Sequence, residues 1–366
     1  MNKRNKMTGQ SAYQGNKEGL PRRRPVLPAV FLLSAFLLAG CGAGEEKTKA
    51  GMQMVQKLDY QGALSSFDEA ESAGENIRLV NRGRGIAYMG LTDYPNAVSC
   101  FEQALSDSSG VVENVDFDLN YYLAAAYTKN GQYREAKSTY DSILSLRPAE
   151  EDAYFLRGSV NLYLSDYEAA KADFEKVMEM SPKNYDRLIE IYQALEAFGY
   201  KDAGQEYLRN ALSAGEAEMA LYDSGRIYYY LGEYQKAYIA LEKAKEKGGA
   251  ESYLYLGKAY EATGDYNYAS SVYSSFISQD SSNAEIYNQL GLCEMQKKDY
   301  QKALEAFQTG MKIEGNEMMQ TLSFNEIVAY EYLGEYQKAA VLLQSYLEIY
   351  PDDETARREL AFLSTR

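Results

Sequence analysis

From residue 45 onward, the apolar positions of the chain recur in units of about 34 residues. Each unit opens with a segment that carries one small residue, often followed three positions later by an aromatic one. A turn of the form Gly-x-Tyr-x-x-Ala, or a related phrase marked by the same tyrosine, comes next. A large side chain often follows the alanine after four positions. Residues three and four apart share one helix face, so each unit predicts two short antiparallel helices.

The turn tyrosine is the clearest marker of the unit. The phrase at residues 231–237 recurs letter for letter at residues 333–339. The markers are Tyr60, Tyr94, Tyr133, Tyr167, Tyr200, Tyr234, Tyr266, Tyr300 and Tyr336. A fixed period of this length indicates an elongated repeat array rather than the two or three globular domains that chain length alone suggests.

Small and large positions alternate between the two predicted helices of a unit. The small residues of the first helix are Gly51, Gly85, Ala124, Gly158, Gly225, Gly257 and Gly291. The large residues of the second helix are Phe67, Phe101, Tyr140, Phe174, Leu241, Tyr273, Phe307 and Leu343. A small residue lets two helices approach and a large one fills the groove beside it, so we expect these positions to face each other.

The chain resembles the tetratricopeptide repeat (TPR) family in its period, in the positions of its small residues and in its turn tyrosines. The resemblance implies an all-α fold, a right-handed superhelical solenoid of about nine helix-turn-helix repeats over residues 45–351. Repeat five (residues 183–215) departs most, because large residues replace the small one near Ile191 and Tyr192 and its register is ambiguous between Ala203 and Gly204. Repeat nine carries Ile327 in place of the small residue. Residues 352–366 predict a C-terminal capping helix with Ala356, Leu360 and Leu363 on one stripe.

The N-terminus resembles the signal peptide of bacterial lipoproteins. A basic segment precedes an apolar run that is too short to span a bilayer, and the run ends in Leu38-Ala39-Gly40-Cys41. The resemblance implies removal of residues 1–40, lipidation of Cys41 and a short tether at residues 41–44, with the protein anchored on the outer side of the cell membrane. An ordinary signal peptide or an uncleaved anchor is the alternative, and Met1 and Met7 are both possible starts.

Composition excludes several chemistries. The chain has no His, which rules out a Ser-His-Asp triad, a Cys-His dyad and a His-ligated metal site. The net charge of −15 argues against binding of nucleic acid. Cys100 and Cys293 lie in different repeats, and we expect both to be small buried side chains. We therefore expect no enzyme activity, no cofactor and no metal.

The remaining function to consider is binding of a partner. The TPR resemblance implies a concave surface lined mainly by the first helix of each unit, and Tyr and Arg dominate binding hot spots. The candidates for contact with a partner are Tyr121, Phe155, Tyr163, Tyr222, Arg226, Tyr229, Tyr230, Phe324 and Tyr332. We expect Tyr228 to pack inside the repeat rather than to face the groove. For each candidate, the alternative to partner contact is packing between adjacent repeats.

Two functions remain open from sequence. The first is a lipid-anchored scaffold at the bacterial cell envelope whose groove holds an extended segment of another protein, and the length of the array favours it. The second is a lipoprotein that captures a peptide or glycan for a transporter or receptor. The 39-residue step from Tyr94 to Tyr133 predicts a long connection at residues 106–116, either a tolerated insertion or a binding loop. Oligomeric state stays undetermined.

Overall fold

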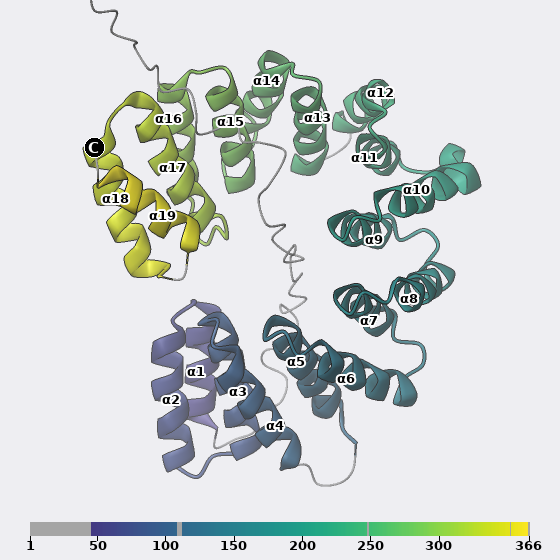
Figure 1. Ribbon diagram of the computed structural model, residues 1–366, viewed down its shortest axis with the longest axis vertical. Helices are drawn as coiled ribbons and strands as arrows, with labels where there is room; N and C mark the ends of the chain where they lie inside the picture. Colours follow the sequence, from purple (N-terminus) through teal and green to yellow (C-terminus); the bar gives the residue numbers. More distant parts are fainter. Residues whose placement is uncertain (1–44, 108–111, 247–248, 352, 365–366) are drawn as a thin grey trace, which may run out of the picture. The chain divides into compact units, whose positions relative to one another are not determined.

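The computed structural model describes residues 45–107, 112–246, 249–351 and 353–364, and all regular structure in these ranges is helical. The helices form antiparallel pairs joined by short turns (Figure 1). The chain divides into two compact units, Met1–Gly204 and Gln205–Arg366, and each is described by itself. No helix within the described ranges combines the length and the apolar character that crossing a membrane requires. The predicted signal peptide, Cys41 and the tether lie outside the described residues.

Unit 1 contains four complete helix pairs and the first helix of a fifth. The helices are α1 (Glu46–Gln56), α2 (Tyr60–Ser72), α3 (Ile77–Gly90), α4 (Tyr94–Ser106), α5 (Asn114–Lys129), α6 (Tyr133–Leu146), α7 (Glu151–Tyr163), α8 (Tyr167–Met180) and α9 (Tyr185–Ala197). Helix α10 (Lys201–Gly215) runs across the division between the units.

Unit 2 continues the same alternation and ends in a single additional helix. Its elements are the 3₁₀ turn Glu216–Glu218, α11 (Leu221–Leu231), α12 (Tyr234–Lys245), α13 (Ala250–Ala262), α14 (Tyr266–Ile277), α15 (Ala284–Gln296), α16 (Tyr300–Met311), α17 (Met319–Leu333), α18 (Tyr336–Ile349) and α19 (Glu354–Leu363). Helix pairing at the predicted period confirms the all-α repeat fold.

The turn tyrosines mark where the second helices begin. Eight of the nine are the first residue of such a helix, and Tyr200 directly precedes α10. An aspartate often comes just before the tyrosine and caps the helix. Asp59 accepts a hydrogen bond from the Gly62 N–H, and Asp299 accepts one from the Lys302 N–H. These caps satisfy backbone donors that the first helical turn leaves unpaired.

The predicted pairing of small and large residues is confirmed. A Cβ atom added to Gly51 would lie 2.6 Å from Cε1 of Phe67, and one added to Gly158 would lie 2.7 Å from Cε1 of Phe174. In repeat six a smaller residue takes the large position, and Gly225 faces Leu241. Glycine is needed at these positions because the partner helix and its side chain occupy the space of a side chain.

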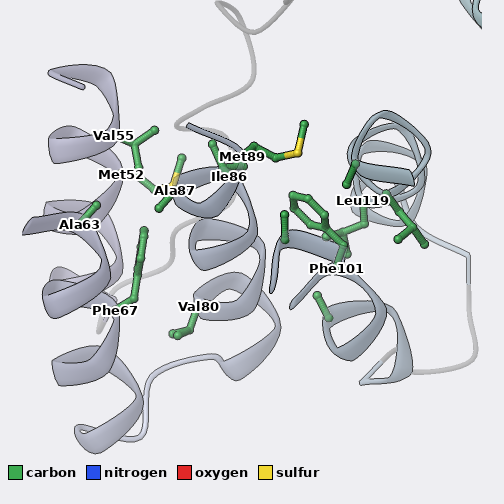
Figure 2. Close-up of a cluster of buried hydrophobic side chains, with 14 of the residues drawn as sticks. Met52, Val55, Ala63, Phe67, Val80, Ile86, Ala87, Met89, Phe101 and Leu119 are labelled. Atoms are coloured by element: carbon green, nitrogen blue, oxygen red, sulfur yellow. The ribbon is translucent and has the colours of Figure 1, made fainter. Parts of the chain in front are cut away.

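A continuous apolar core joins neighbouring repeats. Figure 2 shows Phe67 and Phe101 from two second helices pointing toward residues of the first helices, including Val80 of α3. Leu119 of α5 belongs to the same cluster and is fully buried. Each repeat therefore buries its large side chain partly against its own first helix and partly against the next repeat.

Repeat five reverses the usual pairing, which resolves the register that the sequence leaves ambiguous. Tyr192 on α9 is buried, and a Cβ atom added to Gly204 on α10 would lie 3.1 Å from Cδ2 of this tyrosine. Gly204 rather than Ala203 thus takes the close position. The large residue has moved to the first helix and the small residue to the second.

The long connection before α5 is shorter than predicted and its end is firmly held. Helix α5 begins at Asn114, because Glu113 and Asp116 form a capping box at its start. Arg78 of α3 pairs with both of these carboxylates. The Arg147 guanidinium covers the Phe117 ring at 3.5 Å from its centroid. Residues 113–116, which were predicted to belong to the loop, are therefore packed against neighbouring helices.

The C-terminal helix closes unit 2. Asp353 caps α19 by accepting hydrogen bonds from the N–H groups of Thr355 and Ala356. Ala356 and Leu363 are buried in the cluster that includes Leu343 of α18, and Leu360 packs against it half-buried. The predicted stripe therefore covers the apolar face of the last repeat.

Candidate partner-binding site

The first helices of unit 2 form one continuous layer. Helix α11 contacts α13, α13 contacts α15, and α15 contacts α17. The second helices α12, α14 and α16 each contact the first helix of the following repeat. Side chains on the free face of the first helices can therefore meet across repeats, as the concave surface of a solenoid requires.

Four tyrosines meet on this layer around Tyr255 of α13. The ring centroid of Tyr255 lies 6.2 Å from that of Tyr222, 5.8 Å from that of Tyr229 and 5.9 Å from that of Tyr230, all three on α11. The contacts are edge-to-face, the arrangement that aromatic quadrupoles favour. The hydroxyl groups of Tyr230 and Tyr255 are 3.1 Å apart and share a hydrogen bond. All four residues are half-buried, so the cluster is partly accessible to solvent.

Arg226 lies beneath these rings rather than on the surface. It is only 7 % exposed, and its guanidinium carbon is 4.2 Å from the Tyr222 centroid and 5.9 Å from the Tyr255 centroid. Its Nη2 donates to the Asp223 carboxylate at 2.6 Å. The arginine therefore holds the two rings in place and cannot reach a partner directly while this packing persists.

Lys258 completes the cluster from α13. Its Nζ is 5.5 Å from the Tyr255 centroid and 3.2 Å from Oε1 of Glu285 on α15. Burial raises the pKa of Tyr222, and a hydrogen bond with Glu251 raises it further, so this phenol stays protonated at neutral pH. The surface thus presents neutral phenol groups with an accessible ammonium and carboxylates at its border.

Tyr255 and Lys258 were missed from the sequence, although a positional signal exists. Tyr255 stands two residues before the small Gly257, as Tyr122 does before Ala124 and Asn325 before Ile327. Each of these side chains reaches back to the preceding first helix: the Arg82 guanidinium lies 5.3 Å from the Tyr122 ring, and Asn325 donates to Asn288 at 2.8 Å. This register position therefore bridges repeats.

In unit 1 the candidates Tyr121 and Phe155 lie in contacts between helices. The Tyr121 ring is edge-on to Tyr140 at 6.2 Å, and burial raises the pKa of its phenol. The Phe155 ring lies 6.0 Å from Phe174, and the Arg187 guanidinium covers it at 4.3 Å. Both side chains are half-buried and pack within the framework, and neither joins an aromatic cluster like that of α11 and α13.

The remaining candidates either stack on a turn tyrosine or pack near the C-terminal end. Tyr163 stacks on the turn residue Tyr133 at 4.6 Å, and Tyr332 stacks on the turn residue Tyr300 at 5.0 Å. Phe324 packs at 5.7 Å against Tyr346, another ring of unit 2. Of the nine candidates, the structure gathers Tyr222, Arg226, Tyr229 and Tyr230 into one site. We call these four with Tyr255 and Lys258 the aromatic cluster.

Both cysteines among the described residues are free thiols. Cys100 and Cys293 are both buried, as predicted, and burial raises the pKa of the Cys100 thiol to about 11. Within the described ranges no three His, Cys, Asp or Glu side chains are grouped so that they could hold a metal ion.

Family comparison supports the repeat assignment in both units. Models of the tetratricopeptide repeat match residues 118–149, 151–184, 251–282, 284–317 and 324–353. The last three of these ranges lie in unit 2 and the first two in unit 1. The chain therefore carries tetratricopeptide repeats over these ranges.

Curated relatives match part of this chain and a smaller part of their own length. The chain is 24% identical over 244 residues to RNA polymerase II-associated protein 3 of Xenopus tropicalis, covering 62% of this chain and 34% of that protein. It is 28% identical over 145 residues to the peptidyl-prolyl cis-trans isomerase FKBP4 of Mus musculus, covering 35% and 32%. The chain thus spans about a third of the length of the curated relatives it matches.

The structure is similar to those of two solved proteins. A tetratricopeptide repeat protein from Parabacteroides merdae is 17% identical with a TM-score of 0.43, covering 78% of this chain and 98% of that one. The APC/C hetero-tetramer Cut9-Hcn1 is 16% identical with a TM-score of 0.40, covering 87% and 76%.

Proposed function

We propose that this chain is a lipid-anchored scaffold of the bacterial cell envelope that has no catalytic role and holds an extended segment of another protein on its first-helix layer. The aromatic cluster of α11 and α13 is the observation that carries the proposal. It combines four half-buried tyrosines, which offer contact area at low entropic cost, with a buried arginine that keeps two of the rings in place.

The chemistry of the cluster favours a peptide with an apolar or aromatic anchor. Edge-to-face packing leaves parts of each ring open to a further side chain, and the phenol hydroxyls can bond backbone amides of an extended segment. Lys258 and Glu285 at the border favour polar residues flanking that anchor.

The anchoring part of the proposal rests on the sequence around Cys41. Leu38-Ala39-Gly40-Cys41 follows a basic segment and an apolar run, in the order that lipidation signals have. Attachment of more than one acyl chain would hold the protein stably on a membrane surface.

The binding part is tested by capture of partners from intact cells after chemical crosslinking. The triple variant Tyr222→Ala, Tyr229→Ala and Tyr230→Ala is compared with the wild type and with Phe362→Ala, which removes an exposed ring of α19 far along the chain. We expect the wild type to capture one protein partner in a saturable manner. The triple variant should capture at least tenfold less of this partner while its helical circular dichroism signal is unchanged. Equal capture by the triple variant, or recovery of lipid without any protein, would refute the scaffold.

The anchoring part is tested separately by metabolic labelling with an alkyne fatty acid. The wild type should incorporate the label and sediment with membranes, and Cys41→Ala should do neither. Label on Cys41→Ala equal to that on the wild type would contradict lipidation at this position.

A further inference from the structure

A second surface feature of unit 2 lies outside the aromatic cluster. Where the turn between α11 and α12 faces the turn between α13 and α14, an open hollow of about 360 Å³ is present. It is lined by Gly232, Glu233, Tyr234, Gln235, Lys236 and Thr263. The hollow is open to solvent, so a ligand would lie against it rather than be enclosed.

A stack of three tyrosines begins beside this hollow. The Tyr238 and Tyr260 rings are 4.4 Å apart at an interplanar angle of 14°, and Tyr260 and Tyr268 are 5.4 Å apart at 21°. The Tyr238 hydroxyl lies 2.6 Å from Oγ1 of Thr263 and shares a hydrogen bond with it, which joins the stack to the wall of the hollow. Tyr268 is 61% exposed and ends the stack, so it offers a ring platform to solvent.

The charges of the hollow are paired with each other. Nζ of Lys236 is 2.6 Å from Oε2 of Glu233 and lies 4.9 Å from the Tyr228 centroid. Burial raises the pKa of the Tyr260 phenol, and the carboxylates of Glu242 and Asp265 raise it further, so the middle ring of the stack stays neutral. An anionic ligand would meet these carboxylates and the net negative charge of the chain.

Neutral hydrogen-bonding groups remain for a ligand. The exposed Gln235 side chain is both donor and acceptor. Gly232 has a φ of 78° and no side chain, so a ligand can approach the backbone of the turn closely. A ligand with many hydroxyl groups and one apolar C–H face matches this combination, because aromatic faces attract the partly positive C–H groups.

We propose that this surface binds a neutral oligosaccharide, with one sugar ring in the hollow and another ring along the same oligosaccharide on Tyr268. The site is separate from the aromatic cluster and does not depend on the scaffold function. It gives the chain a second recognition surface for uncharged glycan.

The test is saturation-transfer NMR on the full-length protein with three probes, cellohexaose, maltohexaose and N-acetylchitohexaose. Tyr268→Ala and Gln235→Ala change exposed side chains and should keep the fold. Gln337→Ala is the matched control, because residues 333–339 repeat residues 231–237 letter for letter at the turn between α17 and α18.

We expect transfer to ring protons of at least one probe, weakened tenfold or more in Tyr268→Ala and Gln235→Ala and unchanged in Gln337→Ala. The proposal is overturned if none of the three probes shows transfer at millimolar concentration. It is also overturned if both site variants bind as the wild type does, or if Gln337→Ala loses binding to the same extent.

Discussion

Gly158 of α7 faces the ring of Phe174 of α8 so closely that a Cβ atom at Gly158 would lie 2.7 Å from Cε1 and 3.0 Å from Cδ1 of the ring. The same relationship between a glycine and a large side chain recurs in repeats of both units. The spacing of the two helices in a repeat is therefore set by a missing side chain.

Replacing this glycine should loosen repeat four. Gly158→Val forces a branched side chain into occupied space, and overpacking of this kind costs about 1–3 kcal/mol. Hydrogen exchange of the α7 and α8 amides, which reports local opening in a repeat protein, measures the loss. Gly249→Val is the control, because nothing lies within 4 Å of its Cβ position and only a helix-cap preference of below about 1 kcal/mol changes.

A compensating change should restore part of the stability. Repeat six pairs Gly225 with Leu241, so a leucine fits the large position. Adding Phe174→Leu to Gly158→Val should cost less than the sum of the two single changes. Strict additivity would show that the two residues do not constrain each other.

A buried ion pair in the same repeat should be costly to break. Arg157 donates from Nη2 to Oδ1 of Asp173 at 2.6 Å and from Nε to Oδ2 at 3.0 Å, and the Asp173 side chain is buried. Arg157→Ala leaves this carboxylate buried without its cation, which costs about 3–5 kcal/mol. Arg358→Ala breaks the exposed pair with Glu354 and should cost below about 1 kcal/mol. Equal losses of thermal stability in the two variants would contradict the account.

Acid should weaken the start of α16. Hydrogen bonds from the Lys302 side chain and backbone lower the pKa of Asp299, so its charged form is favoured by folding. The stabilisation is complete above the unfolded pKa of about 3.9 and is lost as the pH falls through the lower folded value. Asp299→Asn keeps an acceptor at the cap and should remove this dependence, as measured by amide exchange of α16 between about pH 6 and pH 3. An unchanged pH profile in this variant would refute the role of the carboxylate.

Both described cysteines should resist thiol reagents in the folded protein. Burial raises the pKa of the Cys100 thiol to about 11 and also raises that of Cys293, so little thiolate is present at pH 8. In a Cys41→Ser variant, a chromogenic disulfide reagent should react slowly before unfolding and titrate both thiols in guanidinium chloride. Immediate reaction of both in the folded state would contradict their burial.

The sequence predicted the repeat architecture because that architecture depends on short-range spacing. Tyr234 and Tyr336 occupy identical phrases and both begin a second helix. The register of repeat five was harder to predict, because the large and small residues have exchanged helices. Tyr192 lies on the first helix and Gly204 on the second, and the pair keeps the same total volume.

The candidate site was predicted in part, because its geometry depends on contacts between repeats. Tyr222, Tyr229 and Tyr230 were expected on the first-helix face, and the structure brings them together. Tyr255 was missed, since only the packing of α13 against α11 turns it toward those rings. Arg226 was expected at the surface and lies beneath the rings, because stacking and Asp223 satisfy its charge there.

We propose that the aromatic cluster, and no other ring surface of unit 2, contacts a protein partner. Photo-crosslinking in intact cells tests it most directly, with benzoylphenylalanine in place of Tyr230 in one variant and of Phe362 in another. We expect one partner segment to link to position 230 and not to position 362. Tyr222→Ala and Tyr229→Ala should reduce the product at position 230. The same products at both positions, or no protein product at position 230, would contradict it.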